Sequence, residues 1–307
     1  MCAPVRYGLS IDNAHPIPDV IDQVRRMADA GIASATVSQI FGYDALTLLA
    51  LVGHEVPDIE LTTSVVPIYP RHPIMLAAQA LTVQAATGGR LTLGVGLSHQ
   101  IVIENMYGYS FDRPARHMRE YLTALVPLLR GEQVSFRGET VTAATFGPIE
   151  VEAPAPTLLV AALGPTMLKL AGTLADGTIT WMTGPATIAS HIAPTINAAA
   201  AEAGRPAPRI SVGLPVCVTD DVDAARERAD KTFAIYGTLP SYRAMLDREQ
   251  AAGPADVAIV GDEQSVAAQL AAVAEAGATD FSAAVYGTRD EQARGFALVA
   301  DLAKAGP

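Results

Sequence analysis

The chain has 307 residues, of which 50% are hydrophobic and 17% are charged, and this composition indicates a compact protein with a large buried core rather than a disordered one. The net charge of −11 and the lack of any cluster of Lys and Arg argue against nucleic acid and anionic membranes as partners, because both require a concentrated basic surface. Cys2 and Cys217 are too few for a disulfide framework, and neither a signal peptide nor a run of roughly 18 apolar residues is present, so we expect a cytoplasmic protein.

Short β-branched runs alternate with segments of helical period along the whole chain. Eight strands are predicted, at residues 5–11, 33–37, 60–66, 91–95, 158–162, 179–182, 210–218 and 280–285. Helices are predicted between them, among them one that ends at Gly31, 44–54, 74–85, 116–129, 266–277 and a last one that ends at Lys304. Within 74–85, one apolar face is predicted from the helical spacing of Ile74, Ala77, Ala78, Leu81 and Ala85.

Two insertions interrupt this alternation. A hairpin is predicted from residues 133–136 and 140–142, joined by a turn at 137–139, and residues 222–261 contain at least two helices and a short strand at 257–260. Eight strands that are each followed by a helix predict a single-domain (β/α)8 TIM barrel over residues 1–307. The hairpin follows the fourth helix, and the extended helical insertion separates strands seven and eight.

An open, doubly wound sheet is the main alternative fold. Its dinucleotide-binding fingerprint is only partly matched by "GVGLSH" at residues 94–99, because His99 stands where that fingerprint has glycine or alanine. The segment also lies in the fourth strand–helix unit rather than in the first. The closed barrel is therefore favoured.

In a TIM barrel, the functional residues lie at the carboxyl ends of the strands. No two carboxylates pair at these positions, and no Ser or Cys nucleophile has an evident base, which argues against hydrolysis and acyl transfer. The six histidines lack the spacing of a metal site, so we expect no metal. The residues at the carboxyl ends of the strands include few reactive side chains, which indicates that a cofactor supplies the chemistry.

The turn after the fifth strand is a candidate anion site. Gly164 can turn tightly, Pro165 suits the first position of a helix, and Thr166 adds a hydroxyl, so a helix N-terminus would face the barrel mouth. An ordinary capped strand-to-helix turn is the alternative.

Four segments together resemble the luciferase-like superfamily of flavin and deazaflavin oxidoreductases, and more closely its actinobacterial branch that depends on coenzyme F420. They are "TTSVVP" (62–67), "GGRLTLGVGLSH" (88–99), "YGYSFDRPARHMREYLTALVPLLRGEQVSFRGE" (107–139) and "LVAALGPTMLKLAGTLADGTITWMTGP" (159–185). The resemblance covers nearly the whole chain and implies a barrel with the hairpin insertion, a homodimer, and a deazaflavin that lies across the strand ends. The cofactor-binding residues that it implies are Ser64, Val65, Gly96, Leu97, Ser98, Ala162, Leu163, Gly164, Pro165, Thr166, Trp181 and Met182.

This resemblance suggests why the fourth strand contains Gly94 and Gly96. Without a Cβ at these positions, a flat three-ring cofactor could lie close to the strand backbone, although close packing of the protein itself is the alternative explanation. The resemblance also implies a cis peptide bond between Ser64 and Val65, which nothing in "TTSVVP" requires by itself.

The sequence departs from the deazaflavin-dependent sugar-phosphate dehydrogenases of the superfamily. They have Asp-His at the end of strand two and a glutamate after strand four, where this chain has Gln39-Ile40 and His99. Sugar oxidation is therefore disfavoured, and His99 is the candidate catalytic side chain, with a scaffolding role as the alternative. Trp181 is expected to line the pocket or to plug the barrel, and weaker candidates for the pocket and for binding anionic parts of the cofactor are Tyr43, Tyr69, Tyr107, Tyr109, Arg71, Arg113, Arg116 and Lys169.

The sequence thus predicts an F420-dependent oxidoreductase that transfers a hydride between the deazaflavin and a small, apolar or conjugated molecule. An FMN-dependent monooxygenase on the same barrel and a non-catalytic deazaflavin-binding protein are the alternatives. A cofactor-free isomerase or aldolase is disfavoured, because no Schiff-base lysine or enediol base stands at a strand end.

Overall fold

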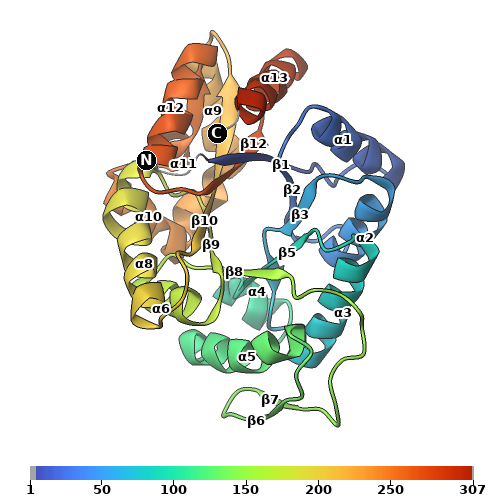
Figure 1. Ribbon diagram of the computed structural model, residues 1–307. Coiled ribbons are helices and arrows are strands. Elements are labelled where there is room, and N and C mark those ends of the chain that lie inside the picture. The colour runs from blue at the N-terminus through green and yellow to red at the C-terminus, as the bar shows by residue number, and fades with distance from the viewer. Residues whose placement is uncertain (1–4, 306–307) are drawn as a thin grey trace.

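The computed structural model describes residues 5–305, and eight of its strands form one closed parallel ring (Figure 1). In ring order they are β1 (Arg6–Ser10), β2 (Ser34–Val37), β3 (Glu60–Thr63), β5 (Leu91–Gly96), β8 (Thr157–Ala161), β9 (Gly177–Trp181), β10 (Arg209–Val218) and β12 (Asp280–Val285). Each strand pairs with the next one in parallel, and β12 pairs with β1 to close the ring. The predicted barrel is confirmed. Cys2 lies outside the described residues, and Cys217 is a buried free thiol.

Helices surround the ring on its outer side, as Figure 1 shows. The longer ones are α1 (Ile17–Asp29), α2 (Ala45–Glu55), α3 (Pro73–Ala86), α5 (Pro114–Leu129), α6 (Pro165–Leu174), α8 (Ala193–Glu202), α12 (Glu263–Glu275) and α13 (Arg289–Ala305). Shorter helical segments are α4 (Gln100–Asn105), α7 (Pro185–Thr187) and the π-helix η1 (Ile188–Ile192), and none of these three was predicted. No helix in residues 5–305 is both long and apolar enough to cross a membrane.

The buried face of α3 agrees only in part with the predicted one. Ala77 and Leu81 are buried and Ile74 and Ala78 are half-buried, but Ala85 is exposed, and Leu76 and Ala80 are buried as well. Apolar residues occur on all sides of this helix, so its spacing alone does not select the face. The neighbouring helices α2 and α5, which pack against α3, select it instead.

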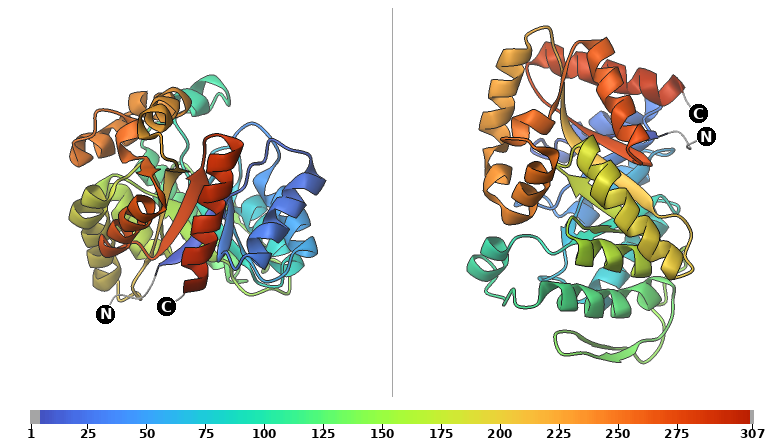
Figure 2. Two further views of the ribbon diagram at one scale, coloured as in Figure 1. Left: turned by 90° about the horizontal axis from the view of Figure 1, so that it is seen from above. Right: turned by 90° about the vertical axis from the view of Figure 1, so that its left-hand side faces the viewer.

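Both predicted insertions are present. The hairpin consists of β6 (Ser135–Arg137) and β7 (Thr142–Ala144), with Phe136 opposite Ala143, and Figure 2 shows it projecting beyond α5. Its turn is held by the Glu120 carboxylate, which accepts hydrogen bonds from the N–H groups of Thr140 (2.7 Å) and Val141 (3.1 Å). The second strand begins two residues later than predicted, because Thr140 and Val141 belong to this turn.

The second insertion contains α9 (Val222–Thr238), α10 (Pro240–Glu249), α11 (Pro254–Val257) and β11 (Ile259–Gly261). The short strand β11 pairs in parallel with the end of β10, with Val260 opposite Cys217. Asp221 begins α9 by accepting a hydrogen bond from the Ala224 N–H at 3.1 Å, as expected for an N-cap. Helices α9 and α10 therefore follow the carboxyl end of β10, on the same side of the barrel as the other strand ends.

The amino end of the barrel is closed by ion pairs. Arg209 crosses the barrel from β10 and binds the carboxylates of Asp280 (2.6 Å) and Glu60 (2.9 Å). Burial opposes the charge of Arg209, but these two carboxylates raise its pKa overall. Arg6 also binds Glu60, at 2.7 Å. These ion pairs close the centre of the barrel at this end, so a ligand that enters the barrel would have to use the opposite end.

Candidate functional site

The predicted cofactor-binding residues fall on four strands that are neighbours in the ring. Ser64 and Val65 follow β3, Leu97 and Ser98 follow Gly96 at the end of β5, residues 162–166 follow β8, and Trp181 ends β9. We call the carboxyl ends of β3, β5, β8 and β9 the rim arc. The structure therefore brings together residues that are up to 118 positions apart in the chain, from Ser64 to Met182.

A bulge divides the predicted strand 60–66 into β3 and the two-residue strand β4 (Val66–Pro67). The Ser64–Val65 peptide bond in this bulge is cis, which confirms the prediction. The end of β2 holds the bulge: the Ser38 hydroxyl donates to the Ser64 carbonyl at 2.7 Å, and the Gln39 N–H donates to the Val65 carbonyl at 3.3 Å. Ser64 in turn donates its N–H to the Val37 carbonyl at 2.7 Å.

The bulge also explains both glycines of β5. A Cβ on Gly94 would lie 2.0 Å from the Thr63 carbonyl oxygen, and a Cβ on Gly96 would lie 2.7 Å from Cγ2 of Val65. The protein's own atoms thus occupy the space that we expected a cofactor ring to use directly. The explanation from the ring is corrected to one from packing: the glycines admit the bulge, and Val65 is the side chain that would lie between Gly96 and any bound ring.

The turn from β8 to α6 offers free hydrogen-bond donors. Pro165 occupies the first position of α6, no side chain caps this helix, and the N–H groups of Thr166 and Met167 have no partner within residues 5–305. Gly164 has φ −79° and ψ 155°, which other residues also adopt, so the tight turn that we expected is not what requires glycine here. A Cβ on Gly164 would have no atom within 4 Å, so the space beside the free donors is open. The arrangement suits an anionic group of a ligand.

His191 supports this turn and was not among the predicted site residues. It is buried in η1, and its Nε2–H donates to the Leu163 carbonyl at 2.8 Å, because only a donor can bind that oxygen. A π-helix often occurs near a functional site. Sequence offers no signal for this contact, since 28 residues separate the two partners.

The helical insertion brings aromatic rings to the rim arc. Trp181 packs edge-on against Phe233 (6.1 Å between centroids) and Tyr236 (5.8 Å), which come from α9. Tyr242 of α10 in turn contacts Tyr236 (5.1 Å) and the His99 ring (5.6 Å). Trp181 therefore lies in an aromatic wall rather than alone, and this wall suits an apolar or conjugated substrate. Its Nε1–H is buried without a partner in the described residues.

Two positions at which related enzymes have acid–base residues have different roles in this structure. His99 precedes α4, and burial lowers its pKa, so it is neutral at pH 7. The Gln39 side chain accepts a hydrogen bond from the Ala45 N–H at 2.7 Å and thereby holds the start of α2. Gln39 is therefore a structural residue, and His99 remains the titratable side chain of the rim arc.

Three of the predicted cations are already paired. Arg71 binds Asp44, while Arg113 and Arg116 both bind Glu139. Lys169 on the exposed side of α6 has no ion pair within the described part of the chain. An anionic ligand would thus rely mainly on backbone donors. Residues 5–305 contain no group of three His, Cys, Asp or Glu side chains that could hold a metal ion.

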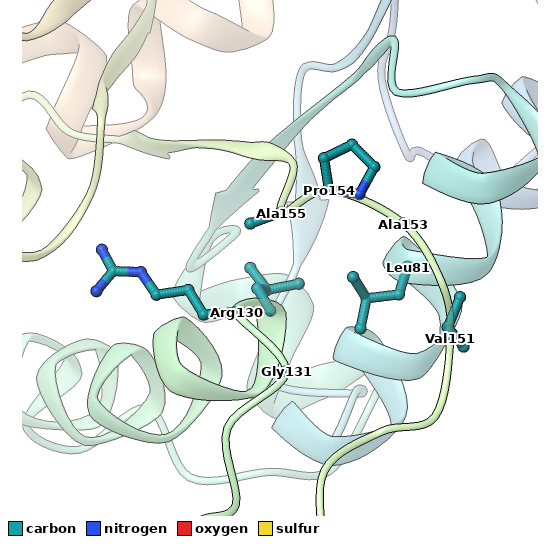
Figure 3. Close-up of a pocket in the computed structure, with 8 residues that line it drawn as sticks. Leu81, Arg130, Gly131, Val151, Ala153, Pro154 and Ala155 are labelled. Carbon is teal, nitrogen blue, oxygen red and sulfur yellow. The ribbon is translucent and has the colours of Figure 1, made fainter.

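Two cavities lie at the other end of the barrel. One, of about 380 Å³, is shown in Figure 3, and its lining residues are Leu81, Leu129, Arg130, Gly131, Val151, Ala153, Pro154 and Ala155. The second, of about 390 Å³, shares Pro154 and Ala155 with it and contains the first residues of β3 and β5. In Figure 3 the Arg130 side chain points away from Leu81 and Val151, and Arg130 is the charged residue among those that line this cavity.

Comparison with known proteins agrees with this architecture. The chain is 29% identical over 278 residues to a provisionally named coenzyme F420-dependent oxidoreductase of Mycobacterium tuberculosis, which covers 84% of this chain and 78% of that protein. The coenzyme F420-dependent tetrahydromethanopterin reductase of Methanopyrus kandleri has a similar structure, with a TM-score of 0.81, 21% identity, and coverage of 97% of this chain and 98% of that one. The oxygenating constituent of 3,6-diketocamphane monooxygenase of Pseudomonas putida, solved with FMN, has a TM-score of 0.74 at 18% identity, with coverage of 99% and 97%.

At these identities the solved structures show the fold, and the family follows from the sequence itself. A family model described as luciferase-like monooxygenase matches residues 1–280. The chain therefore belongs to the luciferase-like monooxygenase family, as the resemblance of its four segments implied.

Proposed function

We propose that this protein is an F420-dependent oxidoreductase that transfers a hydride between the deazaflavin and a small, apolar or conjugated organic molecule. The observation that carries the proposal is the rim arc, in which the Val65 bulge, the free donors of α6 and the aromatic wall lie on neighbouring strands. The similarity to a protein named as an F420-dependent oxidoreductase supports the choice of cofactor.

The residues present suit a flat cofactor with an anionic tail. Val65 would support the ring from the strand side, and the N–H groups of Thr166 and Met167 would bind a phosphate. Bound F420 would supply or accept the hydride. The chain's own contribution is to position the partners and to exclude water with the Trp181 wall, while His99, neutral at pH 7, can accept or donate a proton at its free ring nitrogen.

An FMN-dependent monooxygenase is the second candidate, favoured by the similarity to the FMN-bound monooxygenase of Pseudomonas putida. The same rim arc would hold either cofactor. The reaction would differ, because a reduced flavin reacts readily with oxygen and a deazaflavin does not. A non-catalytic deazaflavin carrier is the third, motivated by the absence of the acid–base residues of the sugar-phosphate dehydrogenases.

Titration of the purified protein with F420 and with FMN, followed by fluorescence, tests the choice. We expect saturable binding of F420 and turnover with at least one member of a panel of enones, imines and alcohols. Binding of FMN alone would replace the proposal with the monooxygenase, and F420 binding without turnover of any panel member would favour the carrier. Binding of neither cofactor would contradict all three.

We further propose that the chain forms a single domain and acts as a cytoplasmic homodimer. The leucines of α2 are largely explained by core packing, since Leu46, Leu48 and Leu49 are buried, and Leu51 is exposed. Sedimentation of the purified protein tests the dimer.

A further inference from the structure

Three aromatic rings from the loop after β4 and from the start of α5 are stacked beside the rim arc. Phe111 stacks on Tyr69 with 5.5 Å between centroids, and Tyr69 stacks on His117 with 4.3 Å and an interplanar angle of 18°. We call these three residues the Tyr69 stack. It adjoins the rim, because Ile68, which precedes Tyr69, donates its N–H to the Gly96 carbonyl at 3.0 Å.

Two polar atoms in this stack have no partner. The Tyr69 hydroxyl and Nε2 of His117 are both buried, and neither forms a hydrogen bond within residues 5–305. Buried polar groups in native proteins are nearly always satisfied, and an unsatisfied one costs stability. Two such atoms on stacked neighbouring rings mark this stack as a place where a hydrogen-bonding group of a ligand would be stabilised.

Helix α5, which carries His117, also contains a buried tyrosine whose hydroxyl has a hydrogen-bond partner. Tyr121 lies one turn after His117 on α5, and its buried hydroxyl donates to the Arg71 carbonyl at 2.7 Å. The fold can therefore provide a partner for a buried tyrosine in this region. The Tyr69 hydroxyl, which is also buried, has no such partner within residues 5–305.

The charges around the Tyr69 stack indicate which chemical group of a ligand could bind there. Burial, followed by the carboxylates of Asp112 and Glu104, raises the pKa of Tyr69 to about 12. Burial lowers the pKa of His117, and Glu120 acts weakly in the opposite direction. Both groups are therefore neutral at pH 7, and the nearby carboxylates disfavour an anionic guest. A hydroxyl or carbonyl oxygen suits a phenol and a neutral imidazole.

Access to the stack depends on Phe111. This residue belongs to the segment 98–113, whose residues 104–110 are all exposed. Ser98 (φ 61°) and Arg113 (φ 51°), at the two ends of the segment, have left-handed backbone conformations that non-glycine residues rarely adopt. Neither polar atom is accessible in this structure, so a ligand can reach them only if a ring of the stack moves. Phe111 lies at one end of the stack and belongs to this exposed segment, so we infer that it is the ring that moves.

We propose that Tyr69 and His117 bind the hydroxyl or carbonyl oxygen of the organic substrate, which makes an alcohol or a ketone the substrate class. This inference deepens the proposed function and rests on it, because the bound molecule is a substrate only if the protein is an oxidoreductase. The site itself is assigned from the two unpartnered atoms and from the stacking of the rings that carry them.

Conservative variants separate this role from packing. Tyr69→Phe and His117→Phe each keep an aromatic ring in the stack and remove the unpartnered atom, so we expect both to raise the midpoint of urea unfolding. Tyr121→Phe is the matched control and should lower the midpoint, because it deprives the Arg71 carbonyl of its donor. A Tyr69→Phe protein that is no more stable than wild type would show that the hydroxyl already has a partner, and would overturn the proposal.

Ligand binding provides the second test. Cyclohexanone and methylenecyclohexane have nearly the same shape and differ in the oxygen, so calorimetry with and without F420 measures what the oxygen contributes. We expect wild type and Tyr121→Phe to prefer the ketone at least tenfold, and Tyr69→Phe to lose that preference. Equal affinities in wild type, or an unchanged preference in Tyr69→Phe, would overturn the proposal. Failure of F420 to bind would contradict only the proposed function, since the unfolding comparison uses no cofactor.

Discussion

Val65 and Gly96 depend on each other, although they lie on different strands. The Val65 side chain projects into the position that a Cβ of residue 96 would occupy, and Ala161 closes the same space from β8 at 3.1 Å. The sequence shows a glycine in a strand but does not show what approaches it. At the scale of single residues, the structure therefore replaces one reason for Gly96 with another.

This dependence gives a testable coupling. Gly96→Ala should destabilise the protein by about 1–3 kcal/mol, the usual cost of overpacking a filled core, because the new methyl group would overlap Val65. The double variant Gly96→Ala with Val65→Ala should recover part of this loss, as urea unfolding of all four proteins would measure. Additive effects of the two substitutions would contradict the contact. F420 affinity should fall in both proteins that lack the Val65 side chain.

The buried histidines predict a dependence of stability on pH. Burial lowers the pKa of His99 and of His117, so the unfolded chain binds more protons than the native one just below pH 6.5. The contribution of these histidines to the free energy of unfolding is therefore fully present above about pH 6.5, and it is lost as the pH falls through their folded pKa values. Urea unfolding at pH 7.5 and 5.5 should show the loss, and His99→Gln should reduce it. An equal loss in wild type and His99→Gln would exclude His99 as a source.

At the scale of elements, α6 begins at the rim arc without a side-chain cap. His191 fixes the Leu163 carbonyl before it, and Gly172 lets α6 approach α8 closely, since a Cβ there would lie 2.6 Å from the Ile196 carbonyl oxygen. Helix α6 is thus positioned from both ends by residues of η1 and α8. Its free N–H groups are held in place before any ligand arrives.

A single charge on α6 should separate stability from binding. Thr166→Asp places a negative charge in the first turn, where it is favourable for the helix, but repels a phosphate bound at the same N–H groups. We expect unchanged or slightly higher stability, together with a loss of F420 affinity of about tenfold or more. Thr166→Asn, which is neutral and of similar size, should bind as wild type does. Equal affinities in the two variants would exclude an anion at this turn.

At the scale of the whole molecule, the two ends of the barrel differ: the residues at the amino end stabilise the fold, and those at the carboxyl end form the candidate site. The amino end is closed by Arg209 with Glu60 and Asp280, whereas the carboxyl end carries the rim arc and is covered by the helical insertion. The ion pairs at the amino end lie mostly out of solvent: the side-chain exposure of Asp280 is 9%. Charges of this kind depend on one another, because removal of one leaves the others without a partner.

Arg209→Met should therefore destabilise the protein by about 3 kcal/mol, because Glu60 and Asp280 would keep only the more exposed Arg6 as a counter-charge among the described residues. Arg294 is the matched control: it binds Glu263 and Asp220 at the surface, and Arg294→Met should cost about 1 kcal/mol or less. Urea unfolding at pH 7 compares the two. Similar losses in both variants would contradict a structural role of the barrel-closing ion pairs.

Much of the fold follows from local pattern. Alternating strand and helix periods predict the eight-stranded barrel, and both insertions lie where the pattern is interrupted. The segments that indicate the family are continuous in sequence, so the cis Ser64–Val65 bond could be expected from them. The predictions of the barrel and the insertions succeed because each depends on neighbours along the chain, whereas the cis bond was expected from the family resemblance alone.

The tertiary structure alone decided which atoms meet across the fold. It placed Val65 against Gly96, His191 under Leu163, the rings of α9 and α10 beside Trp181, and Tyr69 between Phe111 and His117. It also completed the buried face of α3, for which the helical spacing gave Ala77 and Leu81 correctly but Ala85 wrongly. Periodicity records which side of an element is apolar, whereas the partner of a side chain is set by long-range packing, and no local pattern contains that information.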